Sequence, residues 1–337
     1  MKINEAKGVV KSFIEKNIKI PVILLGPPGI GKTAICQQIA DELDYECLIF
    51  ECSSLDPSDV RGLPFFENGT TKFSLSPLHP KVYTQGDNKP GIIVLDEISF
   101  AAKTVQRALN SLLLQRRLGV HRIPENYFIV ATGNPPEYGG DILINTLINR
   151  CCILDVQPDM EDWLENCPGI NPLVRSFIRL KNKYFYTYNV KEQNQSFCSP
   201  RTWMFVSELV DKDIINKEAF VGLVGPAGVD FYNYVTIKKL KEIDIDKILQ
   251  ELIIEEDINV LMYINEAIVQ RILNNDIHPN LVNYILKLSK VSKELAYILL
   301  KFLAKKPLEI FKSGKITEIK KVFGDSILLD HIVSRDN

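Results

Sequence analysis

The stretch GPPGIGKT, at positions 26–33, carries residue types that can hold phosphate. It satisfies the pattern G-x-x-x-x-G-K-[ST] through Gly26, Gly31, Lys32 and Thr33. Glycines let successive backbone N–H groups converge on a phosphate where a helix begins, and the helix dipole favours an anion there. In such a loop the lysine reaches the β and γ phosphates and the threonine hydroxyl binds Mg²⁺. The residues expected to bind the nucleotide here are Gly26, Pro27, Pro28, Gly29, Ile30, Gly31, Lys32, Thr33 and Ala34.

Two carboxylates follow the apolar run of GIIVLDE at positions 91–97. Asp96 lies at the carboxyl edge of the predicted strand, where it can bind the same Mg²⁺ as Thr33, so we assign the metal and part of the cofactor site to this pair. Glu97 comes next and can orient and deprotonate a water. A simple kinase does not need a second carboxylate. The pair therefore favours a nucleotide-hydrolysing enzyme that uses ATP and Mg²⁺, with Glu97 as catalytic base.

Asn134 ends a further apolar run, YFIVATGN at positions 127–134. An amide at the tip of a strand next to the acidic strand can hydrogen-bond the attacking water or the γ-phosphate. Taken alone, an Asn before Pro135 and Pro136 is more typical of a turn. Its position after the two preceding motifs makes Asn134 a candidate catalytic residue.

These candidates require a parallel sheet to bring them together. Five short, nearly continuous apolar runs rich in Val and Ile are typical of strands covered on both faces, namely IPVILLG, CLIFECS, GIIVLDE, YFIVATGN and CCILDV. Helical stretches lie between most of them, as at 33–43 and 102–114, and a helix is expected over 4–16. The pattern predicts a doubly wound α/β domain over residues 1–155.

A long insertion over about 56–90 separates the second and third predicted strands. Its segment FFENGTTKF places Asn68-Gly69 between β-forming residues, which is a strong β-hairpin signal. A hairpin inserted in a loop usually serves contacts rather than the core.

The strand pattern stops after Asp155. Amphipathic stretches such as PLVRSFIRLKNKYF and PRTWMFVSELVD predict an α-helical domain over 156–240, and further helices predict an α-helical C-terminal extension over 241–337. In the extension Ser292 is placed to cap a helix. The apolar stripe expected on that helix comprises Val291, Leu295, Ile298, Leu299 and Phe302.

Composition excludes several classes of protein. The 337 residues carry a formal net charge of −2 and 46% hydrophobic residues, without a run long enough to span a membrane, and charges scattered through the N-terminus argue against a secretory signal. We therefore expect a cytoplasmic protein without a membrane or nucleic-acid partner. The seven cysteines and four histidines lack the spacing of a zinc site, and buried free cysteines are expected.

In their order along the chain, the three motifs resemble the Walker A, Walker B and sensor 1 motifs of AAA+ ATPases. The resemblance implies a P-loop NTPase (AAA+) core with an α-helical lid. It also extends to INTLINRC, which is similar to the segment ending in an arginine finger and so places Arg150 at a subunit boundary, facing a neighbour's γ-phosphate. CSPRTW resembles sensor 2, with Arg201 turned toward the nucleotide of its own subunit. Both arginines are thereby candidate catalytic residues.

Within this family, residues 5–225 look most like the MoxR-like branch. DPSDVRGLP, the hairpin after it and ALNSLLLQRRLGVHRIPENYFIVATGNPPE carry that resemblance. In that branch the insertion, and a second hairpin near RRLGVHRIP, face the ring pore or the partner. Two positions depart from the branch: Ser99 stands where Asn is frequent, and Cys151 follows the finger where Phe is usual.

The resemblance implies an ATP-hydrolysing chaperone that works as a homo-oligomeric ring, with six subunits expected, and remodels a protein client that often bears a von Willebrand A domain. One alternative is a nucleic-acid motor or a restriction-type, McrB-like motor using GTP. It predicts a basic pore face, whereas Arg61, Lys72 and Lys81 of the insertion are accompanied by the acidic residues Asp56, Asp59, Glu67 and Asp87. Another alternative is a nucleotide-gated binding module with slow hydrolysis.

Overall fold

The computed structural model describes residues 1–83, 89–191, 195–237, 240–306, 319 and 321–323. The chain divides into two compact units. The first comprises Met1–Asn166, Tyr188–Gln195 and Ser199–Arg201, and the second comprises Cys167–Thr187, Ser196–Cys198 and Thr202–Asn337. The domain boundaries expected at residues 155 and 240 stay predictions. Much of the predicted extension beyond residue 306 lies outside the described residues.

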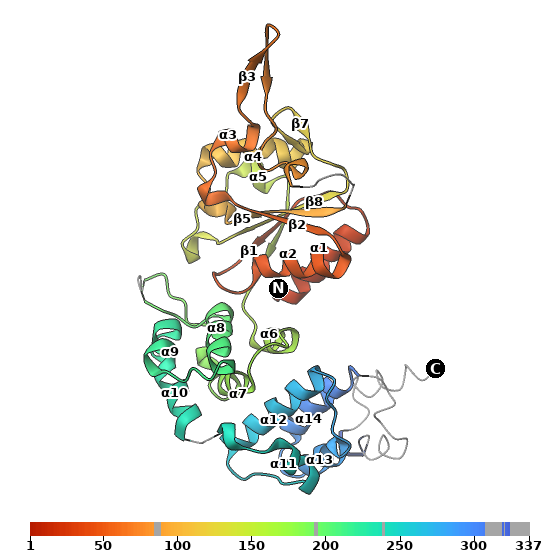
Figure 1. The fold of residues 1–337 in the computed structure, drawn as a ribbon, viewed down its shortest axis with the longest axis vertical. Helices are drawn as coiled ribbons and strands as arrows, with labels where there is room; N and C mark the ends of the chain where they lie inside the picture. The colour runs from red at the N-terminus through yellow and green to blue at the C-terminus, as the bar shows by residue number, and fades with distance from the viewer. Residues whose placement is uncertain (84–88, 192–194, 238–239, 307–318, 320, 324–337) are drawn as a thin grey trace, which may run out of the picture. The chain divides into compact units, whose positions relative to one another are not determined.

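The first unit is an α/β fold around a five-stranded parallel sheet with the strand order β2-β5-β8-β1-β9. In Figure 1, α1 and α2 cover one face of the sheet, and α3, α4 and α5 lie on the other. The strands of the sheet are β1 (Val22–Leu25), β2 (Glu46–Glu51), β5 (Gly91–Asp96), β8 (Tyr127–Gly133) and β9 (Cys152–Asp155). The helices are α1 (Ile3–Glu15), α2 (Lys32–Leu43), α3 (Pro57–Arg61), α4 (Lys103–Gln115), α5 (Asn145–Ile148) and α6 (Met160–Asn166).

The apolar character of the strands explains this layering. Both faces of β5 and β8 are buried, because side chains that point to opposite faces, such as Ile92 and Ile93, are both inaccessible to solvent. On one face the core joins Ile93 and Ile129 to the apolar side of α4. The predicted α/β core and its parallel sheet are confirmed.

The predicted hairpin in the insertion is confirmed as β3 (Pro64–Glu67) and β4 (Thr70–Phe73). Asn68 and Gly69 both have positive φ, of 50° and 77°, which is the backbone geometry that a two-residue turn requires. The hairpin projects from the α/β unit, as Figure 1 shows. A shorter hairpin, β6 (Arg117–Leu118) and β7 (His121–Arg122), follows α4.

The second unit is helical throughout the part that the structure describes. Its helices are α7 (Pro172–Leu180), α8 (Pro200–Asp211, whose first residues group with the first unit), α9 (Lys217–Val224), α10 (Ala227–Ile237), α11 (Ile245–Glu251), α12 (Ile258–Leu273), α13 (Leu281–Leu288) and α14 (Lys293–Leu303). Ser292 caps α14 as predicted, because its side chain accepts a hydrogen bond from the Leu295 N–H at 3.3 Å. The assignment of Val291 to the buried stripe is wrong: Val291 precedes the cap and is 65% exposed.

A buried ion network joins two helices of the second unit. Arg175 on α7 donates from Nε to the Glu266 carboxylate on α12 at 2.8 Å, and Arg179 donates to the other oxygen of the same carboxylate. Arg175 and Glu266 are inaccessible to solvent. Each buried charge therefore depends on its partner for stabilisation.

All seven cysteines are free, and Cys36, Cys52 and Cys198 are buried, as small apolar residues would be. No helix among the described residues combines the length and the apolarity that a bilayer crossing would need.

Candidate nucleotide-binding site

The phosphate loop lies between β1 and α2, as the sequence predicts. The Gly26 N–H donates to the Gly133 carbonyl at 3.2 Å, which fixes the start of the loop against the end of β8. A Cβ at Gly26 would approach the Val156 carbonyl oxygen to 2.3 Å, so this position accepts only glycine. Gly29 and Gly31 have φ of +77° and +103°, which other residues rarely adopt. The conformation of the loop therefore requires glycine at these three positions.

Lys32 is 8% exposed and lies under this loop. Its Nζ donates to the carbonyls of Gly26 and Pro27 at 2.9 and 2.8 Å, and to Oδ1 of Asn134 at 3.0 Å. Burial is the main cause that lowers the pKa of Lys32 to about 8; the positive charge of Arg201 contributes to this shift, and the negative charges of Asp96 and Glu97 oppose it. An added anion beside the amine would stabilise its charged form.

Thr33 and Asp96 meet at the carboxyl edge of the sheet. The Thr33 hydroxyl donates to Oδ1 of Asp96 at 2.7 Å. Thr132, on β8, donates its hydroxyl to the same carboxylate oxygen. The pairing of Leu95 with Ala131 in the β5–β8 register explains the second contact, because it places Thr132 beside Asp96. Two hydroxyls therefore hold this carboxylate in place.

Glu97 has a left-handed backbone, with φ of 56° and ψ of 38°. This conformation is costly for a residue with a Cβ, and such strain clusters at functional sites. The Glu97 N–H donates to Oγ1 of Thr132 at 3.3 Å, and its side chain is exposed at the end of β5. The carboxylate of Glu97 is thus accessible to a water at the edge of the sheet.

Asn134 follows β8 and is held from two sides. Its side-chain oxygen accepts from Lys32, and its backbone N–H donates to Oγ of Ser99 at 2.9 Å. Ser99 is fully buried just after β5, and a Cβ on Gly133 or Gly140 would lie 3.1 or 3.0 Å from its hydroxyl. Two glycines therefore make room for the Ser99 hydroxyl beneath Asn134.

Arg201, at the start of α8, lies beside the phosphate loop within the first unit. Its N–H donates to the Gly29 carbonyl at 3.1 Å. A Cβ at Gly29 would lie 2.8 Å from Oγ of Ser199, so the loop and the start of α8 approach closely. The Arg201 side chain is exposed, and its charge reaches Lys32 strongly enough to lower the pKa of that amine.

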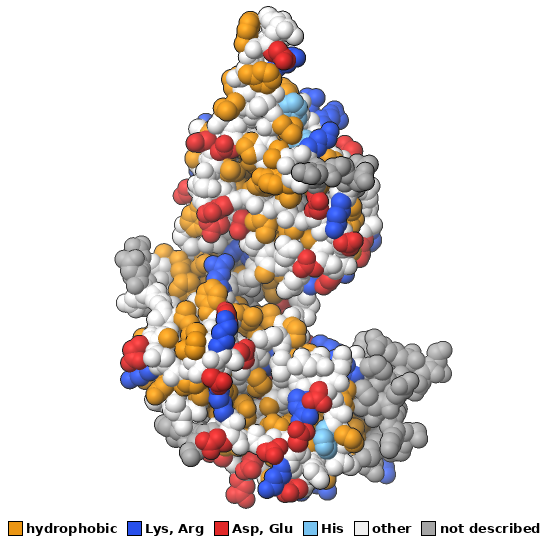
Figure 2. Space-filling view, in the orientation of Figure 1, with side chains coloured by type: hydrophobic (Ala, Val, Ile, Leu, Met, Phe, Trp, Pro, Cys, Tyr) orange, Lys and Arg blue, Asp and Glu red, His pale blue; other side chains and the backbone are white. Residues whose placement is uncertain are grey.

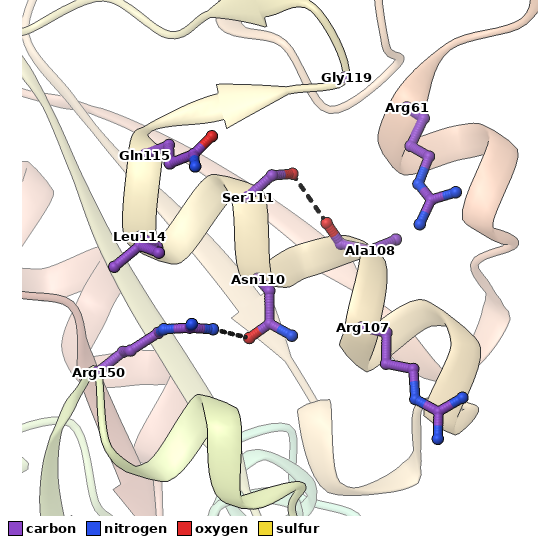
Figure 3. Close-up of a pocket in the computed structure, with 9 residues that line it drawn as sticks. All are labelled: Arg61, Arg107, Ala108, Asn110, Ser111, Leu114, Gln115, Gly119 and Arg150. Atoms are coloured by element: carbon purple, nitrogen blue, oxygen red, sulfur yellow. Dashed lines mark hydrogen bonds between the residues drawn. The ribbon is translucent and has the colours of Figure 1, made fainter.

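Arg150 lies away from this cluster, at the end of the turn that follows α5. Its Nη1 donates to Oδ1 of Asn110 on α4 at 2.9 Å. Arg150 lines a surface hollow on α4, drawn in Figure 3, which contains none of the phosphate-loop residues. The structure therefore brings Lys32, Thr33, Asp96 and Asn134 together and leaves Arg150 apart from them.

Thr132 and Ser99 hold the site together, and the sequence did not assign either of them a role. The only signal for Thr132 was a polar residue within an otherwise apolar strand. Ser99 departs from the MoxR-like branch, in which Asn is frequent at this position. Its contact with Asn134 depends on the close approach of the segments that follow β5 and β8, which no local sequence pattern specifies.

The arrangement can accommodate a nucleotide with Mg²⁺. A Cβ at Gly31 would meet no atom within 4 Å, so space is open where α2 begins. The N–H groups of the first turn of α2 have no partner within the helix, which suits an anion. Thr33 and Asp96 present hard oxygen atoms at 2.7 Å from one another, the ligand type that Mg²⁺ prefers.

Residues 21–151 match the family model described as the AAA domain of the dynein-related subfamily. Midasin of Giardia intestinalis is 33% identical over 162 residues, which are 43% of this chain and 3% of midasin. Replication factor C subunit 3 of Saccharomyces cerevisiae is 27% identical over 166 residues, which are 48% of this chain and 43% of that protein. The chain thus spans less than half the length of either relative.

Among solved structures, the RuvB Holliday junction branch migration motor of Thermotoga maritima is 15% identical, with a TM-score of 0.35 over 81% of this chain and 75% of RuvB. A mutant form of the same RuvB has 14% identity and a TM-score of 0.39 over 74% of this chain and 80% of that one. The matched segment 21–151 spans the phosphate loop, the Asp96-Glu97 pair, Asn134 and Arg150. Residues 21–151 thus match an AAA domain, and the α/β unit has the fold of an AAA+ P-loop NTPase.

Proposed function

We propose that this chain is an ATP-hydrolysing remodelling motor of the MoxR-like branch, which acts as a homo-oligomeric ring on a protein client. The observation that carries the proposal is the convergence of Lys32, Thr33, Asp96 and Asn134 at one edge of the sheet. Six subunits, a cytoplasmic location and a client with a von Willebrand A domain are the finer expectations from the branch resemblance.

Each residue of the cluster has a distinct task in this proposal. Loop N–H groups and Lys32 bind the phosphates, and Thr33 with Asp96 holds the metal. Mg²⁺, when bound, neutralises charge that develops on the phosphate oxygens. Glu97 accepts the proton of the attacking water, and Asn134 orients that water or the γ-phosphate.

The two arginines act on the same phosphates from different subunits. Arg201 lies beside Gly29 of its own phosphate loop, which supports action within one subunit. Arg150 lies in a separate hollow and donates to Asn110, which supports a role at a subunit boundary. A ring supplies such a boundary to every subunit.

The exposed hairpin supports a protein client. Leu63, Phe65, Phe66 and Phe73 are 63%, 46%, 76% and 38% exposed, and Figure 2 shows hydrophobic side chains along the projecting hairpin. Exposed apolar groups of this kind mark protein interaction sites. Lys72 pairs with Glu67 at 2.5 Å, which reduces the positive charge that a nucleic-acid motor would need there.

The test is a turnover assay with ATP, GTP, DNA and candidate client proteins. Lys32→Ala should abolish nucleotide binding at the phosphate loop. Glu97→Gln should retain binding and lose turnover, because it removes the base and leaves the phosphate and metal contacts. Glu15→Gln on α1, an exposed carboxylate, is the matched control and should keep wild-type turnover.

Three results would contradict the proposal. Wild-type turnover in Glu97→Gln would remove Glu97 as the base. Strong stimulation by DNA, or a preference for GTP, would favour the nucleic-acid or McrB-like motor. Binding of ATP without measurable turnover in the wild-type protein would favour the nucleotide-gated binding module.

A further inference from the structure

A hollow of about 420 Å³ lies on the outer side of α4, and three arginines line it. Arg61 comes from the end of α3, Arg107 from α4, and Arg150 from the turn after α5. In Figure 3, Arg61 and Arg107 lie on one side of the view and Arg150 on the other, with Asn110 between them. Three segments that are distant in sequence therefore bring like charges to one place.

The backbone around the hollow is held by close contacts. A Cβ at Gly119, in the turn of the β6–β7 hairpin, would lie 2.1 Å from the Arg61 carbonyl oxygen. The side chain of Asn110 accepts a hydrogen bond from Arg150 and donates one to Oγ1 of Thr146 at 3.2 Å. These two bonds hold α5 and the turn after it against α4. The positions from which the arginines extend are therefore defined by packing.

The charge of the hollow is uncompensated. Arg61 and Arg107 are exposed, Arg150 is half-buried, and no carboxylate belongs to the lining. Within the described part of the chain, no Asp or Glu forms an ion pair with any of the three. Guanidinium groups without a carboxylate partner can each donate charge-assisted hydrogen bonds to the oxygens of a polyvalent anion in the hollow.

We propose that Arg61, Arg107 and Arg150 together form a second phosphate-binding site, which takes the phosphate chain of a nucleotide. The volume lies within the usual range for small-ligand pockets, about 300–1,000 Å³, and favours a compact polyanion over an extended acidic peptide. The guanidinium fork matches phosphate oxygens in pairs. The proposal rests on the proposed function, since it extends the role of Arg150 to two further arginines.

The first experiment measures turnover and nucleotide affinity in Arg61→Ala and Arg107→Ala. Each variant should lose about 10- to 100-fold in turnover, the effect of one charge-assisted contact, whereas affinity at its own phosphate loop should stay within about twofold. Arg107→Lys keeps the positive charge but loses the paired N–H donors of the guanidinium group. Its turnover should therefore lie between those of wild type and Arg107→Ala. Lys16→Ala, which removes an exposed positive charge at the end of α1, is the control and should match wild type.

Two further experiments distinguish whether the phosphate chain belongs to a nucleotide held by a neighbouring copy or to a free nucleotide. For a nucleotide held by a neighbouring copy, Arg107→Ala subunits mixed with Glu97→Gln subunits should regain turnover, because mixed rings contain interfaces with an intact base and an intact hollow. For a free nucleotide, Lys32→Ala protein should still bind inorganic tripolyphosphate in calorimetry, and Lys32→Ala/Arg107→Ala should not. Either result supports the site.

The proposal would be overturned by wild-type turnover in Arg107→Ala and Arg61→Ala, or by a loss that neither arm explains. An effect of Arg107→Ala on client capture alone would assign the hollow to an acidic partner segment and would likewise overturn it. Failure of the proposed function is distinguishable, because then wild-type protein would not hydrolyse ATP and Arg150→Ala would not be rescued by mixing either.

Discussion

Ser99 illustrates how a residue without direct ligand contact can control the chemistry. Its buried hydroxyl accepts the Asn134 N–H at 2.9 Å, while its own backbone carbonyl accepts the Asp141 N–H at 3.2 Å. Ser99 follows the strand that carries Asp96 and Glu97. It therefore positions Asn134 relative to Glu97 across two neighbouring strands.

Ser99→Ala should lower turnover about 5- to 30-fold, the effect of about 1–2 kcal/mol on the barrier, because it leaves the Asn134 N–H unpartnered. Nucleotide affinity should change little, since Lys32 and the loop are untouched. Steady-state kinetics and nucleotide titration measure the two quantities. Ser54→Ala, which removes an exposed hydroxyl, is the control. An equal loss of affinity and turnover would show that Ser99 supports the whole site rather than Asn134.

At the scale of elements, the base of the β3–β4 hairpin is fixed by a glycine. Gly62 has φ of +80°, and a Cβ there would lie 2.1 Å from the Ser74 carbonyl oxygen. Leu63 and Ser74 close the hairpin through two hydrogen bonds, at 2.8 and 2.9 Å. The direction of the hairpin therefore depends on the absence of a side chain at Gly62.

Gly62→Ala should lower the free energy of unfolding by about 2–3 kcal/mol, because the backbone must shift and the φ is unfavourable. Gly8→Ala is the matched substitution. Gly8 lies within α1 with no atom near its Cβ position, so alanine should raise stability by about 0.5–1 kcal/mol. Urea unfolding of both variants provides the comparison. Equal effects on stability would mean that the close approach at Gly62 is readily relieved.

The buried ion network between α7 and α12 is expected to contribute to the stability of the second unit. Glu266→Ala leaves two buried guanidinium groups, Arg175 and Arg179, without their shared carboxylate. The cost expected for breaking such a pair is about 3–5 kcal/mol. Glu251→Ala, at the exposed end of α11, should change stability by less than about 0.5 kcal/mol. A small effect of Glu266→Ala in thermal unfolding would indicate that water enters and solvates the arginines.

The whole molecule is expected to assemble when it binds nucleotide. If Arg150 contacts a neighbour's phosphates, ATP binds the assembled form more tightly than the free subunit and shifts the equilibrium toward the ring. Light scattering of Glu97→Gln should therefore show a larger species with ATP than without it. Arg150→Ala in the same background should weaken this response. A monomer under both conditions, at tens of micromolar protein, would exclude the ring.

Local signals in the sequence determined the α/β core and the phosphate loop. Hydrophobic periodicity marks the strands, and Gly26, Gly31, Lys32 and Thr33 mark the loop, because binding a phosphate at a helix start needs these residue types in this order. The Asn68-Gly69 turn and the Ser292 cap are equally local, and the structure has both. Val291 matches the helical spacing, but it lies before the Ser292 cap and is therefore outside the helix and exposed.

Contacts between distant segments were decided by the tertiary structure alone. Thr132 meets Asp96 because β8 lies beside β5 in the sheet, and Ser99 meets Asn134 at the end of the same pair of strands. The three arginines of the hollow come from segments up to 89 positions apart, 150 minus 61, and only the packing of α3, α4 and the turn after α5 assembles them. The spacing of residues in the sequence encodes local backbone geometry. Contacts between distant residues depend instead on strand order and helix packing, which no local pattern specifies.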